Sequence, residues 1–251
     1  MSQAEETESG LESVRGGRRT AMTITYTYRR GLYVNLTNRC PCACVFCLRQ
    51  NGDGVGESGS LWLEHEPSAE EVRAAIDSRD LGQFDEVVFC GYGEPTERLD
   101  VLLESARHIR AVAPSCRIRV NTNGLSDLIN GRETAPLLKG LVDVVSVSLN
   151  TPDPDEYVRM CRPRFGRRSY DAMLAFARDC RRFVPEVVLS IVGSPVTTPE
   201  QQTACRAIAD SIDVKLRIRA YEGESFFAGR GHGSQIASLR KRSGGISADF
   251  P

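Results

Sequence analysis

Long apolar runs are missing from this chain, and so is a strong net charge. No stretch approaches the roughly 18 consecutive apolar residues of a membrane-spanning helix, and the first 25 residues hold no apolar core of signal-peptide length. The net charge of the 251 residues is −1, so the chain as a whole is not attracted to membranes or to nucleic acid. We therefore expect a cytoplasmic protein with no membrane partner, and direct nucleic-acid binding is not indicated.

Histidine is scarce, whereas cysteine is plentiful. The three histidines are scattered, and none stands at metal-ligand spacing from another histidine or from a cysteine. We therefore assign no catalytic role to histidine. The chain has nine cysteines, and in a reducing compartment this number indicates metal binding together with buried free thiols, not disulfides.

The length and composition suit one α/β domain with a sizeable core. The chain is 41% hydrophobic and 26% charged, which is ordinary for a globular protein. Its two ends are poor in large apolar residues, so they cannot bury enough surface to offset the entropy of ordering. We predict a disordered N-terminal tail at residues 1–20, a core domain at 21–222 and a flexible basic C-terminal tail at 223–251.

Strand and helix patterns alternate within the predicted core. The strands are expected at Thr23–Tyr28, Leu32–Thr37, Glu86–Cys90, Arg117–Asn121, Val142–Leu149, Val187–Val192 and Lys215–Arg219. The helices are expected at Ala69–Ile76, Leu99–Val112, Tyr170–Phe183 and Pro199–Ile212. This alternation predicts βα units and a parallel sheet. Without the first strand, which forms a hairpin with the second, six strands remain, too few for a closed eight-stranded barrel.

Polar residues occupy alternate positions in several of these strands. The outward face of a β/α barrel packs beneath helices and must be apolar, so the polar side chains are expected to face the lumen. They make that lumen polar and basic, and they are Arg117, Arg119, Asn121, Asn123, Ser146, Ser148, Asn150, Lys215, Arg217 and Arg219. The alternative is that some of them face solvent, above all Lys215 and Arg217, which stand far from the carboxyl ends of the strands.

The segment from Cys40 to Cys47 carries the strongest chemical signal. Cys40, Cys44 and Cys47 have the spacing C-x3-C-x2-C, and three thiolates on a tight loop can hold three corners of an iron–sulfur cube while one iron stays open. A zinc site is the alternative, although structural zinc usually takes two separated C-x2-C pairs and this chain has no second pair. Cys42 lies outside the pattern as a neighbouring thiol.

A second signal follows the strand at Glu86 about 45 residues after the cysteines. Gly91, Tyr92, Gly93, Glu94 and Pro95 form a strand-end turn, and glycines there allow the backbone itself to approach a ligand. The same residues also suit an ordinary strand-to-helix turn.

The cysteine spacing, the aromatic residue before the third cysteine and this turn together resemble the radical S-adenosylmethionine (SAM) superfamily. The resemblance implies a partial (β/α)6 barrel, one 4Fe–4S cluster on Cys40, Cys44 and Cys47, and SAM on the open iron. It also implies that an electron from flavodoxin or ferredoxin splits SAM to a 5′-deoxyadenosyl radical, which abstracts hydrogen from substrate. The positions implied to contact SAM are Phe46, Gly91, Tyr92, Gly93, Glu94, Asn123, Ser146, Ser148, Asn150 and Val192.

At the subgroup level, the segments Tyr33–Cys40, Gly91–Thr96 and Arg162–Gly166 resemble the TatD-associated radical SAM proteins. That resemblance implies a functional link to a TatD-type hydrolase. In size the chain is similar to the 7-carboxy-7-deazaguanine synthase class, which has a trimmed barrel.

We therefore predict a radical SAM enzyme that acts on a small anionic or nucleotide-like substrate, with Arg219, Arg162 and Asn35 as substrate-contacting residues. One alternative is an activase of the glycyl-radical-enzyme type, which acts on a protein. The other is a zinc-stabilised binding module without enzymatic activity. The basic run from Arg159 to Arg168 fits a substrate loop, a docking surface for an acidic electron donor or a solvated face.

Overall fold

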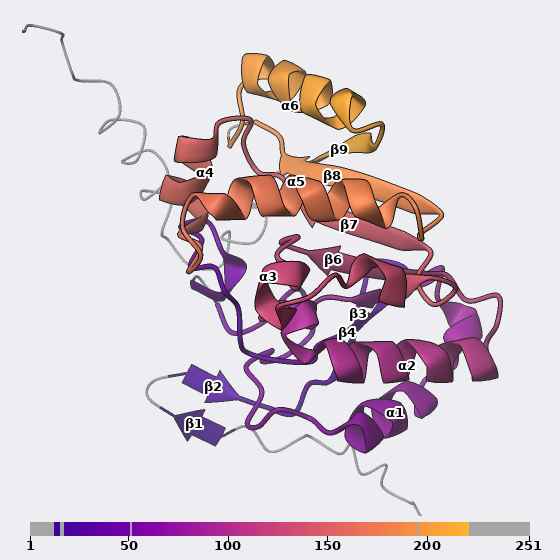
Figure 1. Cartoon of the computed structure of the whole chain (residues 1–251). Helices are drawn as coiled ribbons and strands as arrows, with labels where there is room; N and C mark the ends of the chain where they lie inside the picture. Colours follow the sequence, from indigo (N-terminus) through magenta and orange to yellow (C-terminus); the bar gives the residue numbers. More distant parts are fainter. Residues whose placement is uncertain (1–12, 16–17, 51, 195, 221–251) are drawn as a thin grey trace, which may run out of the picture.

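The computed structural model describes residues 13–15, 18–50, 52–194 and 196–220 (Figure 1). Most of the two predicted tails lies outside these residues. Within the predicted N-terminal tail, β1 (Ser13–Arg15) and β2 (Arg18–Thr20) form a short antiparallel hairpin. No helix in the described ranges is long and apolar enough to cross a membrane.

A seven-stranded sheet organises the rest of the chain, with its strands in sequential order from β3 to β9. β3 and β4 pair antiparallel as a hairpin, and each later strand pairs parallel to the one before it. The six parallel strands are the ones that the sequence predicts, with bounds that shift by a few residues. The strands are β3 (Thr25–Tyr28), β4 (Gly31–Val34), β5 (Glu86–Phe89), β6 (Ile118–Thr122), β7 (Val144–Ser148), β8 (Glu186–Val192) and β9 (Lys215–Arg219).

Helices cover the outer face of the curved sheet (Figure 1). The α-helices are α1 (Ala69–Asp77), α2 (Leu99–Val112), α3 (Ser126–Asn130), α4 (Pro154–Cys161), α5 (Arg168–Cys180) and α6 (Pro199–Ser211). Short 3₁₀ turns are η1 (Leu48–Gln50), η2 (Leu81–Gln83), η3 (Pro95–Arg98) and η4 (Ala135–Leu138). The predicted helices are present, and α3 and α4 are additional. Both are too short for an apolar periodicity to stand out in the sequence.

The predicted basic loop at Arg159–Arg168 is therefore partly helical. Its first residues end α4, whose N-cap Asp153 accepts a hydrogen bond from the Glu156 amide and is followed by Pro154 at the first helical position. Its last residue, Arg168, begins α5. The turn between the two helices contains only the middle of the basic run.

The alternation of side chains in the strands separates an apolar shell from a polar inner face, but Arg117, Lys215 and Arg219, which the sequence predicts to face the lumen, are exposed to solvent. Outward side chains such as Val87, Phe89 and Leu189 are fully buried beneath the helices. On the inner face, the Arg217 Nη2 of β9 donates to Ser146 Oγ of β7 at 2.9 Å. Because these two strands are not neighbours in the sheet, this hydrogen bond crosses the concave face. Arg217 thus faces the lumen.

One prediction concerns the start of α6, which packs against β9. Thr198 caps this helix by accepting from the Gln201 amide at 3.3 Å, and Gln201 Oε1 accepts from the Thr198 amide at 3.0 Å. Thr198→Ala removes this capping box and should lower the free energy of unfolding by about 1 kcal/mol. Urea unfolding followed by circular dichroism measures the change.

Thr203→Ala is the matched control, since its exposed hydroxyl only donates back to the Pro199 carbonyl one turn earlier. It should leave the urea midpoint near that of the unchanged protein. An equal loss of unfolding free energy in both variants would contradict a role for the capping box.

Candidate active site

The loop that carries Cys40 to Cys47 follows β4 and lies at the carboxyl ends of the parallel strands. The exit of β5 contacts it, because the Glu94 amide donates to the Arg39 carbonyl at 2.8 Å. The exit of β6 contacts it as well, with Asn123 Nδ2 at 4.0 Å from Cys40 Sγ. Parallel strands bring their carboxyl ends to one edge, so residues far apart in the chain meet around the cysteines.

The backbone of the cysteine loop is held by the end of α4. The amide of Ala43 donates to the Cys161 carbonyl at 3.0 Å, and the amide of Val45 donates to the Met160 carbonyl at 2.9 Å. In the opposite direction, the Arg164 amide donates to the Pro41 carbonyl at 2.8 Å. The middle of the basic run therefore serves as the backbone partner of the cysteine loop, a role that the sequence pattern does not reveal.

Arg49 provides a second clamp that sequence reasoning missed. Its guanidinium donates to three backbone carbonyls, those of Cys42 at 3.1 Å, Asn38 at 3.4 Å and Tyr92 at 3.4 Å. It thereby joins the cysteine loop to the exit of β5. A single arginine two residues after the third cysteine carries no sequence signal, because its partners are backbone atoms.

The surplus thiols hydrogen-bond to the motif thiols. A hydrogen bond from Cys161, followed by one from Cys42, lowers the pKa of Cys44 to about 4. Hydrogen bonding to Cys42 also lowers the pKa of Cys40, whereas burial raises the pKa of Cys47. The pKa values of Cys42 and Cys161 are raised, chiefly by these same hydrogen bonds. Hydrogen bonding from Cys42 and Cys161 thus favours the thiolate forms of Cys40 and Cys44, and thiolates are the metal-binding form of cysteine.

The exit of β5 is packed tightly against the exit of β4. A Cβ at Gly93 would lie 2.3 Å from the Thr37 carbonyl oxygen and 2.5 Å from that of Arg39. A Cβ at Gly91 would lie 1.9 Å from Asn35 Oδ1. At Gly93 the obstacle is backbone, so only glycine allows the exits of β4 and β5 to approach so closely, whereas at Gly91 the obstacle is the Asn35 side chain.

Tyr92 points away from this backbone cradle. Its hydroxyl donates to the Gly52 carbonyl at 2.8 Å, and its ring stands edge-on to Trp62 at a centroid distance of 5.1 Å. The Tyr92 side chain therefore connects the exit of β5 to the Gly-rich segment that follows the cysteines. Only the Tyr92 backbone remains available for the predicted contact with SAM.

The Glu94 side chain, expected among the SAM contacts, is fully used within the protein. Its Oε1 accepts from the Thr96 amide at 3.2 Å, the Thr96 hydroxyl at 2.8 Å and the Thr122 hydroxyl at 2.7 Å. Its Oε2 accepts from the Asn123 amide at 2.7 Å. Burial raises the pKa of this carboxyl group, while these hydrogen bonds oppose the rise. Glu94 therefore joins the exits of β5 and β6 and positions the residues around it.

The other residues expected to contact SAM lie at different distances from the cysteine loop. Asn123 and Asn150 border the cysteine loop, and the Asn150 Nδ2 donates to Cys161 Sγ at 3.3 Å. Asn150 takes a left-handed backbone conformation with φ of 66°, which asparagine tolerates better than most residues. Ser146 lies four residues before Asn150, within β7 and farther from the cysteine loop, and its hydroxyl accepts a hydrogen bond from Arg217. Phe46, Ser148 and Val192 are half-buried, and so is Asn123.

The three expected substrate residues lie at different places. Arg219 is exposed at the end of β9, in register with Val192. Arg162 is exposed at the C-terminus of α4, beside the cysteine loop. Asn35 is fully buried, and its Nδ2 donates to the Leu61 carbonyl at 2.9 Å.

Comparison with known proteins gives two kinds of relative. The chain is 30% identical over 172 residues to the probable dual-specificity RNA methyltransferase RlmN of Mycolicibacterium vanbaalenii, covering 63% of this chain and 43% of the relative. It is 33% identical over 153 residues to the GTP 3′,8-cyclase of Streptomyces coelicolor, covering 58% and 41% respectively. The chain thus spans less than half the length of these curated relatives.

A solved structure supports the fold, and a family match supports the site. A radical SAM methyltransferase from Sphaerobacter thermophilus superimposes with a TM-score of 0.52 at 16% identity, covering 81% of this chain and 70% of that one. The radical SAM superfamily matches residues 34–208, a range that includes the cysteine loop and every strand from β5 to β8. The chain therefore belongs to the radical SAM superfamily, whose members use a 4Fe–4S cluster and S-adenosylmethionine.

Proposed function

We propose that this radical SAM enzyme abstracts a hydrogen atom from a small anionic or nucleotide-like substrate held in the lumen. The observation that carries the proposal is the positive charge on the inner face of the sheet. Arg119 of β6 and Arg217 of β9 both face the lumen, and Arg219 continues the same face of β9 toward the carboxyl end. Guanidinium groups in a partly desolvated lumen favour an anionic ligand.

The named activities of the curated relatives support the nucleotide-like part of the proposal. One relative is named a GTP cyclase and the other an RNA methyltransferase. Both names describe chemistry on nucleotides. Because this chain covers less than half of each relative, the substrate of this enzyme is proposed from its own lumen as well.

The residues of the cysteine loop fit the cofactors. Cys40, Cys44 and Cys47 provide three thiol ligands, and the backbone of the β5 exit lies against the start of the loop that carries them. Cys40, Cys44 and Cys47 would hold a 4Fe–4S cluster, which would supply the electron for the reductive cleavage of SAM. The donors Cys42 and Cys161 stabilise negative charge on the ligating sulfurs, as outer-shell hydrogen bonds do in metal sites.

Radical SAM enzymes generally receive electrons from flavodoxin or ferredoxin. We place this protein in the TatD-associated subgroup, with a functional link to a TatD-type hydrolase, on the motifs described above. All nine cysteines are free, which supports the reducing cytoplasm as its compartment. We take residues 21–222 as the catalytic domain, and the family match at 34–208 lies within them.

The first test is the release of 5′-deoxyadenosine. The anaerobically reconstituted protein, reduced with dithionite in the presence of SAM, should bind about four irons and release 5′-deoxyadenosine. Cys44→Ala should reduce that release at least about 100-fold, since loss of a metal ligand removes the cluster or its geometry. Chromatography of the products and iron analysis provide the measurements.

Cys116→Ala is the matched control, because this half-buried thiol precedes β6 at the opposite end of the sheet. It should release as much product as the unchanged protein. Equal release by Cys44→Ala would contradict the cluster assignment. One zinc ion in place of iron would favour the binding module, and hydrogen abstraction from a peptide would favour the activase.

The second test concerns the glycine cradle. Gly93→Ala introduces a methyl group into backbone atoms of the β4 exit, which cannot shift as a side-chain end can. SAM affinity, measured anaerobically by equilibrium dialysis with the reconstituted protein, should fall at least about tenfold because the cradle must open. The iron content should fall less than the affinity.

Gly52→Ala is the control, since its Cβ would meet only the Gly54 carbonyl oxygen at 4.0 Å and its φ is not positive. It should bind SAM like the unchanged protein. Unaltered SAM affinity in Gly93→Ala would exclude the strand-end backbone as part of the SAM site.

A further inference from the structure

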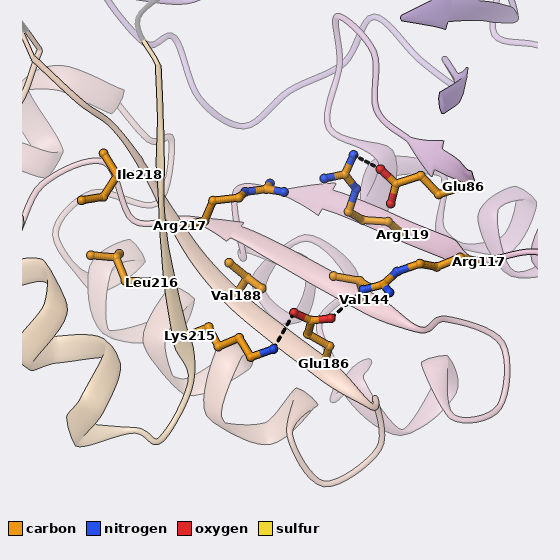
Figure 2. A pocket seen from close by; sticks show the side chains of 10 residues that line it. All are labelled: Glu86, Arg117, Arg119, Val144, Glu186, Val188, Lys215, Leu216, Arg217 and Ile218. Carbon is orange, nitrogen blue, oxygen red and sulfur yellow. Dashed lines mark hydrogen bonds and ion pairs between the residues drawn. The ribbon is translucent and has the colours of Figure 1, made fainter. Parts of the chain in front are cut away.

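A cavity of about 490 Å³ opens at the amino-terminal ends of the parallel strands (Figure 2). Its lining includes the first residues of β5, β7, β8 and β9. The cysteine loop follows the carboxyl end of β4, so the cavity lies at the opposite end of the partial barrel. None of the residues predicted to contact SAM lines it.

Cations outnumber carboxylates in this cavity, so the carboxylates do not pair with every cation. Arg117 and Lys215 share Glu186, at 2.6 Å and 3.1 Å. Arg119 pairs with Glu86 at 2.6 Å. Within the described residues, Arg217 has no carboxylate at ion-pair distance, and it donates a hydrogen bond to the neutral Ser146 hydroxyl.

The two inner arginines extend toward each other from β6 and β9 (Figure 2). Arg119 is 8% exposed, and the Nε atoms of both arginines are buried without a hydrogen-bond partner. Burial first, and then the nearby cations Arg119 and Arg219, lower the pKa of Arg217. Arg119 is buried and Arg217 is half-buried, so the two facing guanidiniums repel each other, and an anion between them would offset that repulsion.

We propose that Arg119 and Arg217 form an oxyanion-binding site for a phosphate or carboxylate group. The planar guanidinium presents paired N–H donors that match the oxygens of either group. Glu86 competes for Arg119 when the site holds no anion, and Arg117 and Lys215 are kept occupied by Glu186.

This site deepens the proposed function and rests on it for its role, which is to hold the anionic end of the substrate. Arg119 and Asn123 are four residues apart along β6, roughly 13 Å at the rise of a strand. For this role, the substrate must be of about nucleotide length, so that its other end reaches the residues around the cysteine loop. A smaller anion would occupy the arginine pair without extending to the residues around the cysteine loop.

The test uses isothermal titration of the reconstituted full-length protein with inorganic phosphate and, separately, with acetate, at constant ionic strength adjusted with chloride. Arg217→Gln and Arg119→Gln should each weaken the binding of phosphate at least about tenfold, since each removes a charge-assisted partner. Acetate that binds as tightly as phosphate assigns the site to carboxylates, and preference for phosphate assigns it to phosphate groups. Absence of binding of both anions to the unchanged protein overturns the proposal.

Two further variants make the result specific. Glu86→Gln removes the competitor of Arg119 and should tighten phosphate binding, and this result stands even where an arginine variant fails to fold. Arg107→Gln, an exposed position on α2, should bind like the unchanged protein. Weaker binding in Glu86→Gln, or unaltered binding in a folded Arg217→Gln, overturns the proposal.

Release of 5′-deoxyadenosine, measured in the same preparations, separates this inference from the proposed function. Release without anion binding at Arg217 refutes the site and leaves the radical chemistry standing. Anion binding that depends on Arg217 without any release refutes the radical chemistry and leaves the site as an anion-binding feature of the fold.

Discussion

The buried carboxylate of Glu94 is the interaction on which the geometry of the active site depends. It accepts hydrogen bonds from Thr96 on its own turn and from Thr122 and Asn123 at the end of the next strand. A buried carboxylate is costly unless donors surround it, so these contacts hold the two strand exits in one arrangement. The amide of the same residue donates to Arg39 at the start of the cysteine loop. One side chain and its backbone thus set the spacing of three strand ends.

The thiols outside the C-x3-C-x2-C pattern take part in the chemistry of those inside it. Cys42 and Cys161 hydrogen-bond to the motif sulfurs, and the second of them arrives from α4, more than a hundred residues later in the chain. The same helix end supplies the backbone bonds that hold the loop. Arg49 contacts the loop as well, because its guanidinium donates to the Cys42 carbonyl. The cysteine loop is therefore positioned by tertiary contacts on both sides, which a metal site needs if its ligands are to keep their geometry.

Much of the fold could be predicted because its signals are periodic. The alternation of apolar and polar residues in β6, β7 and β9 identifies strands and also separates shell from lumen. The helix bounds of α2 match the prediction because its amphipathic pattern is long. The short α4 was missed, since eight residues hold too few turns for a pattern, and its capping Asp153 and Pro154 were the available signals. The contacts of Tyr92 and Glu94 with SAM stay predictions, and the structure adds that both side chains have partners within the protein.

The sequence by itself determined the chemistry of this protein. Three cysteines at close spacing and a glycine-containing strand end are local features, and local spacing is enough to identify a cluster loop and its family. Only the tertiary structure decided which residues surround that loop and which charges share the lumen. Arg119 and Arg217 are nearly a hundred residues apart in the chain. They meet because parallel strands on a curved sheet direct alternate side chains into one interior, and no linear pattern records which of those side chains find a countercharge.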